Sequence, residues 1–287
     1  MFDLIKDSLK GLNPNEVPVL AAALAFYALL SLAPLVTISI AIAGLVFSQA
    51  AVEGEIVTAT AEFIGEPAAV FVQDIIKNSL STTTGGLLAV VSFVFLLFAS
   101  STVFWQLRIS LNMVWGLMPK AEQSNQNYRA TIKDRQLSIV TALVVGFLLL
   151  GAMLFNSLAA TIFLRPIQNL LTGLEWIAWL LSLVVAPAIY LVIFAAIFKL
   201  LPNAKIKWRD AWPGAAVTAG LFWIGSYFIW LYLTRSGVAS IYGAAGSIIV
   251  FLLWIYASAW IFLFGAKFTQ VYANKYGTPI VPLESKN

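Results

Sequence analysis

The distribution of charged residues along this chain leaves few choices of fold. Its 17 Lys and Arg and 13 Asp and Glu all lie outside six windows of 23 to 36 residues. The windows are 17–52, 78–107, 136–164, 176–198, 211–234 and 236–266. Because about 20 apolar residues in a helix cross a bilayer, we predict an all-α polytopic membrane protein. With 61% hydrophobic and 10% charged residues, a soluble globular enzyme, a disordered chain and a coiled coil are excluded.

We expect one membrane domain over residues 1–287. Its six predicted spans are about 18–47, 86–107, 137–161, 176–199, 212–233 and 238–266. Basic residues collect in the cytoplasmic loops of membrane proteins, and here 14 Lys and Arg lie on one side of the predicted membrane and 3 on the other. Both termini lie on the side with 14, so we expect both in the cytoplasm. The net charge of +4 is then mostly an orientation signal, and nucleic acid is not an expected partner.

Two segments outside the spans have amphipathic patterns. The apolar residues of segment 2–12 recur at steps of three and four, which predicts a short helix on the inner leaflet, with a frayed tail as the alternative. The first outer loop contains two more apolar patterns, divided by Gly65 and Pro67, which predict two short amphipathic helices over the outer face. Its carboxylates lack the spacing of a calcium loop, so a solvated acidic face is favoured over a cation site.

Seven residues are candidates for a substrate pathway. Pro34 should kink or break the first span and free carbonyl groups at a transport site; a kink that serves packing alone is the favoured alternative. Arg108 and Asn112 are four residues apart and share a helix face near the cytoplasmic interface. There Arg108 would either reach lipid phosphate or line a cavity. The candidates are Tyr27, Ser31, Pro34, Arg108, Asn112, Tyr242 and Tyr256.

Small residues in the fifth and sixth spans indicate a close approach of two helices. Ala216 and Gly220 form a small-xxx-small pair, and Gly243 and Gly246 give the start of the sixth span a flat surface. We expect these four residues to pack the two spans together. Asp210, just before the fifth span, is a predicted N-cap.

The composition also excludes several kinds of chemistry. The chain has no Cys and no His, which removes disulfides, thiolate and imidazole metal ligands, and the usual general base at neutral pH. The cytoplasmic carboxylates are scattered, and Asp134 and Asp210 have basic neighbours. We therefore predict no catalytic residues, no metal and no cofactor, and do not expect an enzyme. The ATP-binding motif G-x-x-x-x-G-K-[ST] is absent as well.

Several segments, taken in order, are typical of one family. They are Leu20–Leu35, Leu111-Asn112 with Trp115-Gly116, Lys133–Arg135, Trp208–Gly214, Tyr242–Ser247, Leu253–Tyr256 and Leu263–Thr269. Over nearly its whole length the chain resembles the YihY / virulence-factor BrkB family of bacterial inner-membrane proteins. The resemblance implies six spans in the inner membrane, and a transporter or an envelope factor linked to serum resistance. Members of the family were long mislabelled as a ribonuclease.

Three positions depart from the pattern of that family. Lys267 stands where the family often has an acidic residue, Ile109 where a polar or acidic residue is frequent, and Ser226 where a basic one is common. If the charges at these positions pair in the family, the pairing is lost or rewired here. A charged transport pathway therefore does not carry over to this chain directly.

Two functions are compatible with these observations. The first is a transporter or flippase of an amphiphilic, lipid-like envelope substrate, not driven by ATP through this chain, with membrane lipids as partners. Spans without charge suit such a cargo better than coupled ions do. The second is a non-catalytic membrane scaffold that binds other cell-envelope proteins. A homo-oligomer is compatible with both.

Overall fold

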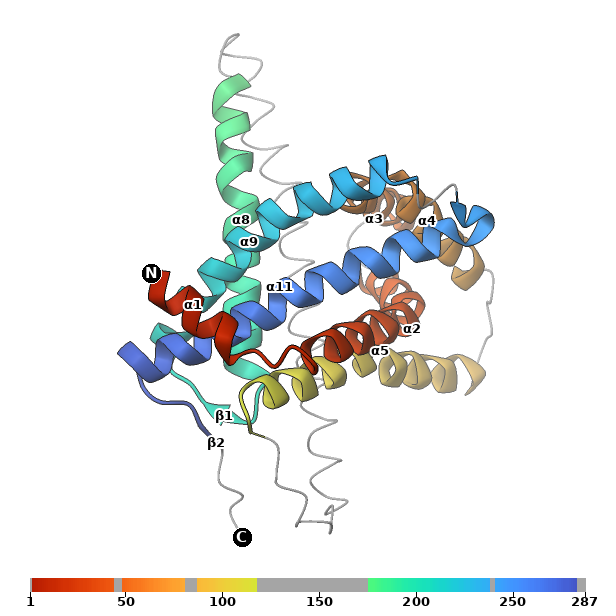
Figure 1. Cartoon of the computed structure of the whole chain (residues 1–287). Coiled ribbons are helices and arrows are strands. Elements are labelled where there is room, and N and C mark those ends of the chain that lie inside the picture. The colour runs from red at the N-terminus through yellow and green to blue at the C-terminus, as the bar shows by residue number, and fades with distance from the viewer. Residues whose placement is uncertain (1, 44–47, 81–86, 118–174, 238–240, 283–287) are drawn as a thin grey trace.

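A computed structural model of the chain describes residues 2–43, 48–80, 87–117, 175–237 and 241–282 (Figure 1). This part of the chain is almost entirely helical. The helices are α1 (Phe2–Gly11), α2 (Val17–Ala43), α3 (Gln49–Ile64), α4 (Glu66–Leu80), α5 (Leu87–Val114), α8 (Glu175–Leu200), α9 (Trp208–Arg235), the 3-10 turn η2 (Gly243–Ala245) and α11 (Gly246–Tyr276). The strands are β1 (Ala204–Lys205) and β2 (Val281–Pro282).

Five of the six predicted spans coincide with long helices, and the span at 137–161 lies outside the described residues. Within the described ranges, three helical stretches are long and apolar enough to cross a membrane: Val17–Ile38, Trp208–Leu233 and Gly246–Tyr276. Helices α5 and α8 cover the predicted spans 86–107 and 176–199. The structure is that of an all-α membrane protein, while the number of six spans and the orientation of the termini stay predictions.

The C-terminal boundary of the sixth predicted span differs from the structure for a physical reason. Helix α11 ends at Tyr276 and not near 266, while α5 covers the predicted span 86–107 and continues to Val114. The charge of Lys267 ends the charge-free window, whereas the buried face of α11 continues through Phe268, Thr269 and Ala273. The last turns of α11 therefore form an amphipathic helix end that a count of charges does not detect.

Helix α11 lies in the middle of the bundle. It packs against α9 on one side and α2 on the other, and α2 packs against α5 (Figure 1). Helix α8 crosses these helices at a steep angle in the figure and packs against α9. The largest core lies near the C-terminal ends of α5, α8 and α11, and contains a group of aromatic rings: Phe194, Phe198, Phe222 and Phe262. This core holds together one end of the bundle, which we call the lysine-rich end. Its lysines are Lys10, Lys199, Lys205, Lys207, Lys267 and Lys275.

The N-terminal segment forms the predicted helix α1, which packs against α11. Its buried residues are Leu4 and Ser8, and the Ser8 hydroxyl donates a 2.6 Å hydrogen bond to the Leu4 carbonyl. Ile5 and Leu9, from the predicted apolar pattern, are exposed. The helix thus packs Leu4 and Ser8 against the protein and leaves the apolar side chains of Ile5 and Leu9 for a membrane surface.

The two helices predicted in the first outer loop are α3 and α4. They meet at Gly65, whose φ of +106° is a conformation that favours glycine. The two helices pack against each other and against α2 and α11. Val52, Val72 and Ile76 form a small core with Val36 of α2. The apolar face of each helix is therefore used for packing onto the bundle.

Pro34 does not break the first span. Helix α2 runs without interruption from Val17 to Ala43 with Pro34 inside it. Around the proline, the Ser31 hydroxyl donates to the Tyr27 carbonyl at 2.6 Å, and the Thr37 hydroxyl donates to the Ala33 carbonyl at 2.8 Å. The helix tolerates the one hydrogen bond that proline removes because its neighbours supply packing on both sides.

The expected packing pair of the fifth span is wrong. Ala216 and Gly220 are exposed, and a β-carbon added to Gly220 would meet nothing within 4 Å. The contact with α11 is made one face away, by Gly214 and Thr218. In α11, Gly246 is buried, whereas Gly243 is exposed in the preceding 3-10 turn at a φ of +53°. The four-residue spacing of two small residues did not by itself indicate which face of α9 is turned inward.

The prediction of Asp210 as an N-cap is also wrong. Helix α9 begins earlier, at Trp208, with Lys207 at the N-cap position and no side-chain capping bond. Asp210 lies in the first turn and is buried, and its Oδ2 accepts a 3.1 Å hydrogen bond from the backbone N–H of Thr278. Nearby, β1 and β2 pair antiparallel, Lys205 with Val281. The segment after α11 is thus tied to the connection between α8 and α9.

Candidate functional site

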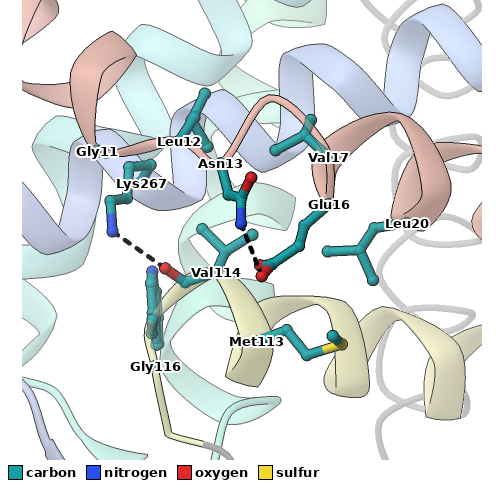
Figure 2. Close-up of a pocket in the computed structure, with 11 residues that line it drawn as sticks. Gly11, Leu12, Asn13, Glu16, Val17, Leu20, Met113, Val114, Gly116 and Lys267 are labelled. Carbon is teal, nitrogen blue, oxygen red and sulfur yellow. Dashed lines mark hydrogen bonds between the residues drawn. The ribbon is translucent and has the colours of Figure 1, made fainter.

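A pocket of about 230 Å³ opens near the C-terminal ends of α5 and α11 (Figure 2). Three segments that are distant in the sequence line it: the link between α1 and α2, the end of α5, and Lys267 of α11. The lining residues are Gly11, Leu12, Asn13, Glu16, Val17, Leu20, Met113, Val114, Trp115, Gly116 and Lys267. About half of these side chains are apolar, and the polar ones include one cation and one anion. The pocket is therefore amphiphilic.

Lys267 enters the pocket because Gly11 has no side chain. A β-carbon on Gly11 would lie 2.6 Å from Cε of Lys267, closer than any real contact allows. The Lys267 ammonium donates to the Val114 carbonyl at 3.2 Å (Figure 2). It also donates to Oε1 of Gln270 at 2.8 Å. An ammonium has three N–H donors, so these two bonds leave one for a further acceptor.

The carboxylate of Glu16 is positioned by the turn that precedes α2. Asn13 Nδ2 donates to Glu16 Oε1 at 2.8 Å (Figure 2). The other end of the Asn13 amide, Oδ1, accepts from the backbone N–H of Asn15 at 3.0 Å, and the Asn13 carbonyl accepts from the N–H groups of Glu16 and Val17. Glu16 is exposed, so its carboxylate is accessible to a ligand.

The end of α5 is capped from α11. The last carbonyl groups of a helix have no partner within the helix, and here Lys267 binds the carbonyl of Val114 while Gln270 Nε2 donates to that of Trp115 at 2.8 Å. In return, Trp115 Nε1 donates to the Ala266 carbonyl at 2.7 Å. A cation also interacts favourably with the negative end of the helix dipole. These bonds give one wall of the pocket a defined shape.

Arg108 and Asn112 share a face of α5, as predicted, and both bind Asn203 after α8. Arg108 Nη2 donates to Asn203 Oδ1, and Asn112 Oδ1 accepts from the Asn203 backbone N–H at 3.0 Å. Arg108 is only 5% exposed. It therefore neither reaches lipid phosphate nor lines the pocket, and the cluster joins α5 to the α8–β1 turn.

Of the other pathway candidates, Tyr27, Ser31 and Pro34 are neighbours on α2, whereas Tyr242 and Tyr256 lie elsewhere. The ring of Tyr27 meets that of Trp105 edge-on, with 6.4 Å between centroids. Tyr256 packs against the main core, and Tyr242 is exposed before α11, at the opposite end of that helix from Lys267. None of the seven predicted residues is among those that line the pocket.

The residues that form the pocket carried weak signals in the sequence. Lys267 stood out only as a departure from a family pattern, and Glu16 only as the boundary of the first charge-free window. Asn13 has no periodic partner along the chain. What joins them is the packing of α1 on α11, which brings residue 11 against residue 267. At Ser226, another of the three departures, the hydroxyl donates to the Phe222 carbonyl at 2.7 Å within α9.

Comparisons with known proteins identify the family. The family model described as Virulence factor BrkB matches residues 8–286. A UPF0761 membrane protein of Tolumonas auensis is 29% identical over 89% of this chain and 80% of its own length. The ribonuclease-like protein YfkH of Bacillus subtilis is 26% identical over 97% of this chain and 98% of its own length. No solved structure matches the chain.

A longer relative also matches most of this chain. The UPF0761 membrane protein RSc1559 of Ralstonia nicotianae is 25% identical over 90% of this chain, which covers 56% of the relative's length. The matches extend over nearly the whole chain, so the resemblance noted from its motifs is confirmed. The chain belongs to the Virulence factor BrkB family.

Proposed function

For this BrkB-family membrane protein, we propose a transporter or flippase of an amphiphilic, lipid-like substrate of the cell envelope. It acts in the bacterial inner membrane, with both termini in the cytoplasm, and this chain does not itself use ATP. The observation that carries the proposal is the pocket, in which Lys267 and Glu16 lie among the apolar side chains of Leu12, Val17 and Leu20. A polar head and an apolar body are what such a lining accommodates.

The position of the pocket supports this assignment. It lies at the lysine-rich end of the bundle, beside α1, whose exposed Ile5 and Leu9 suit a membrane surface. With both termini in the cytoplasm, as proposed, this end of the bundle faces the inner leaflet, where an amphiphile presents its head group. Two of the three apolar stretches long enough to span a membrane, in α2 and α11, begin at or pass the pocket. A head group bound there would be next to the surfaces along which it has to move.

The test is reconstitution of the full chain into liposomes that contain a fluorescent lipid. The expected result is lipid exchange between leaflets faster than in empty liposomes. Met113→Trp, which fills the pocket from α5, should slow the exchange several-fold, because the larger side chain occupies the site. Val19→Trp is the matched control, since Val19 is 66% exposed on α2 outside the pocket. Exchange no faster than in empty liposomes, with and without a membrane potential, would contradict the proposal.

A scaffold that binds other envelope proteins is the second candidate, and the exposed face of α9 favours it. Large apolar side chains are exposed along the second half of this helix: Trp223, Ile224, Tyr227, Phe228 and Tyr232. Aromatic residues are enriched where proteins bind one another, although lipid also covers such faces in a membrane. Crosslinking in cells followed by mass spectrometry separates the two functions. A stoichiometric partner protein favours the scaffold, and a solitary monomer or homodimer does not.

We further propose that the chain is not an enzyme and binds no nucleic acid. Asp210, one of the two carboxylates considered for a metal site, uses its Oδ2 to accept from the Thr278 N–H and is buried. The other, Asp134, lies outside the described residues. The check is a ribonuclease assay of the purified chain with magnesium or manganese. Activity that is lost in Asp210→Ala or Asp134→Ala would overturn this proposal.

A further inference from the structure

We propose that the pocket recognises a zwitterionic phospholipid head group that carries a phosphate and a primary ammonium. This inference rests on the proposed handling of an amphiphile at this site. The Lys267 ammonium is assigned to the phosphate, and the Glu16 carboxylate to the ammonium of the ligand. The size of the pocket, its two charges and the nature of its walls support this assignment.

The size of the pocket limits which part of a lipid can bind inside it. Pockets for drug-sized ligands occupy about 300–1,000 Å³, whereas this one has about 230 Å³. A head group fits such a volume, and a complete lipid does not. The ligand's chains must therefore lie outside the pocket, along the surface of the bundle.

Lys267 provides a directed donor for a phosphate. Two of its N–H groups are held by the Val114 carbonyl and Gln270 Oε1, which fix the position of the ammonium at the pocket wall. The third donor is left for an anionic oxygen. Gly11 on the opposite segment leaves the space around Cε open, because a β-carbon there would lie 2.6 Å from Cε and the lysine would have to shift from its present position.

Glu16 provides the complementary acceptor. One of its carboxylate oxygens accepts from Asn13 Nδ2 at 2.8 Å, which orients the group and leaves the second oxygen for a ligand donor. No ion pair within 4.0 Å joins Glu16 to Lys267 in the described structure, so the two charges do not neutralise each other directly. A ligand with both charges satisfies both groups, whereas an anionic lipid would place net negative charge beside Glu16.

The walls of the pocket favour a primary over a quaternary ammonium. Quaternary ammonium groups are bound by the faces of aromatic rings, and the single aromatic residue among those lining the pocket is Trp115. Its side chain is buried, and its Nε1 is engaged by the Ala266 carbonyl. A primary ammonium instead donates N–H bonds to a carboxylate, which a quaternary one cannot do. The geometry therefore fits phosphatidylethanolamine better than phosphatidylcholine.

The experiment is native mass spectrometry of the detergent-solubilised full chain with equal amounts of phosphatidylethanolamine, phosphatidylcholine and phosphatidylglycerol. The wild-type chain should bind the ethanolamine lipid about two- to fivefold more than the other two, the range set by a solvent-exposed ion pair. Glu16→Gln, which keeps the shape of the side chain, should reduce the preference over the choline lipid to about one. Lys267→Gln should weaken binding of both of these lipids, and Lys267→Arg should restore part of it.

Control variants test whether the lipid preference depends on the charges in the pocket or on the charge of the chain in general. Asp3→Asn and Lys6→Gln change exposed charges on α1 outside the pocket and should keep the wild-type preference. Thermal unfolding of each variant checks that the fold is intact, because Lys267 also caps α5. A wild-type chain that binds the three lipids equally or prefers phosphatidylglycerol overturns the inference, and so does a Glu16→Gln chain that keeps the preference.

Two further measurements complete the experiment. A competition experiment identifies the source of the head group, and a comparison with the liposome assay separates this inference from the proposed function. Water-soluble glycerophosphoethanolamine should not displace the lipid at equal concentration; displacement would mean that the ligand is a soluble compound, which overturns the lipid assignment. If liposomes show lipid exchange but binding has no head-group preference, only the inference fails. If the ethanolamine lipid binds selectively and no exchange occurs, the inference stands and the proposed transport fails.

Discussion

Thr218 of α9 fills the space beside Gly265 of α11, where a β-carbon would lie 2.8 Å from the Cβ of Thr218. Four residues away on each helix the relationship is reversed, and Thr269 fills the space beside Gly214 with its Cβ at 2.7 Å. Each threonine hydroxyl donates to the carbonyl of the glycine four residues before it, at 2.7 and 2.8 Å. The two antiparallel helices thus share one reciprocal motif, which allows their backbones to approach closely.

The first prediction concerns these glycines. Gly265→Ala and Gly214→Ala should each lower the free energy of unfolding by about 1–3 kcal/mol, the cost of overpacking a tight contact. The added methyl group would meet a β-branched side chain, and at Gly214 also the Cα of Thr269 at 3.0 Å. Thermal unfolding in detergent micelles measures the change. Gly220→Ala is the matched control and should be neutral or slightly stabilising, because that position is open. An equal loss in all three variants would contradict the motif.

The second prediction concerns the buried cluster at Arg108. Asn112→Leu should destabilise the chain by about 1–3 kcal/mol, the penalty for a buried donor without a partner. The donor in question is the backbone N–H of Asn203, which is bound to Asn112 Oδ1. The exposed Asn15→Leu serves as the comparison and should change the unfolding temperature little. A chain with Asn112→Leu that unfolds at the wild-type temperature would show that this bond is dispensable.

The third prediction concerns Pro34. Pro34→Ala should raise the unfolding temperature, because it restores one backbone hydrogen bond in a continuous helix; proline in a helix interior costs up to about 3 kcal/mol. The rate of lipid exchange in liposomes should stay the same, since the pocket lies near the start of α2 and not at Pro34. A stable variant with slower exchange would instead identify Pro34 as a hinge in transport.

The fourth prediction concerns the tie between Asp210 and the segment after α11. Asp210→Ala removes the acceptor of the Thr278 N–H and should loosen the pairing of β1 with β2. Limited proteolysis should then cut residues 277–282 faster than in the wild-type chain, by about fivefold or more if the lost bond is worth about 1 kcal/mol. Asp3→Ala, at an exposed position of α1, should leave the rate of cleavage unchanged. Equal protection in both variants would show that β1–β2 pairing does not depend on Asp210.

The charge-free windows were sufficient to predict helices at five described positions, because hydrophobic length alone requires them. The same reasoning did not indicate which face of a helix points inward, since α9 is apolar on all sides. The pairs Ala216–Gly220 and Gly214–Thr218 have the same four-residue spacing. Which pair makes the contact depends on the position of the partner helix. Such a contact can be identified only from the three-dimensional arrangement of both helices.

The candidate site was harder to predict than the fold. The sequence indicated Arg108 and Asn112 correctly as two residues on one face, but their shared partner, Asn203, follows a different helix. Charged residues were interpreted first as orientation signals. For Lys267 and Glu16 that interpretation hides a second role, which arises from the packing of α1 against α11.

That packing also determines when the pocket can form during synthesis. Its walls come from residues 11–20, 113–116 and 267, so the site has high contact order. The α1–α2 link is made first, yet it can meet Lys267 only after α11 has entered the membrane. An incompletely inserted chain should therefore lack the proposed head-group site, and ligand binding would report on completed assembly of the bundle.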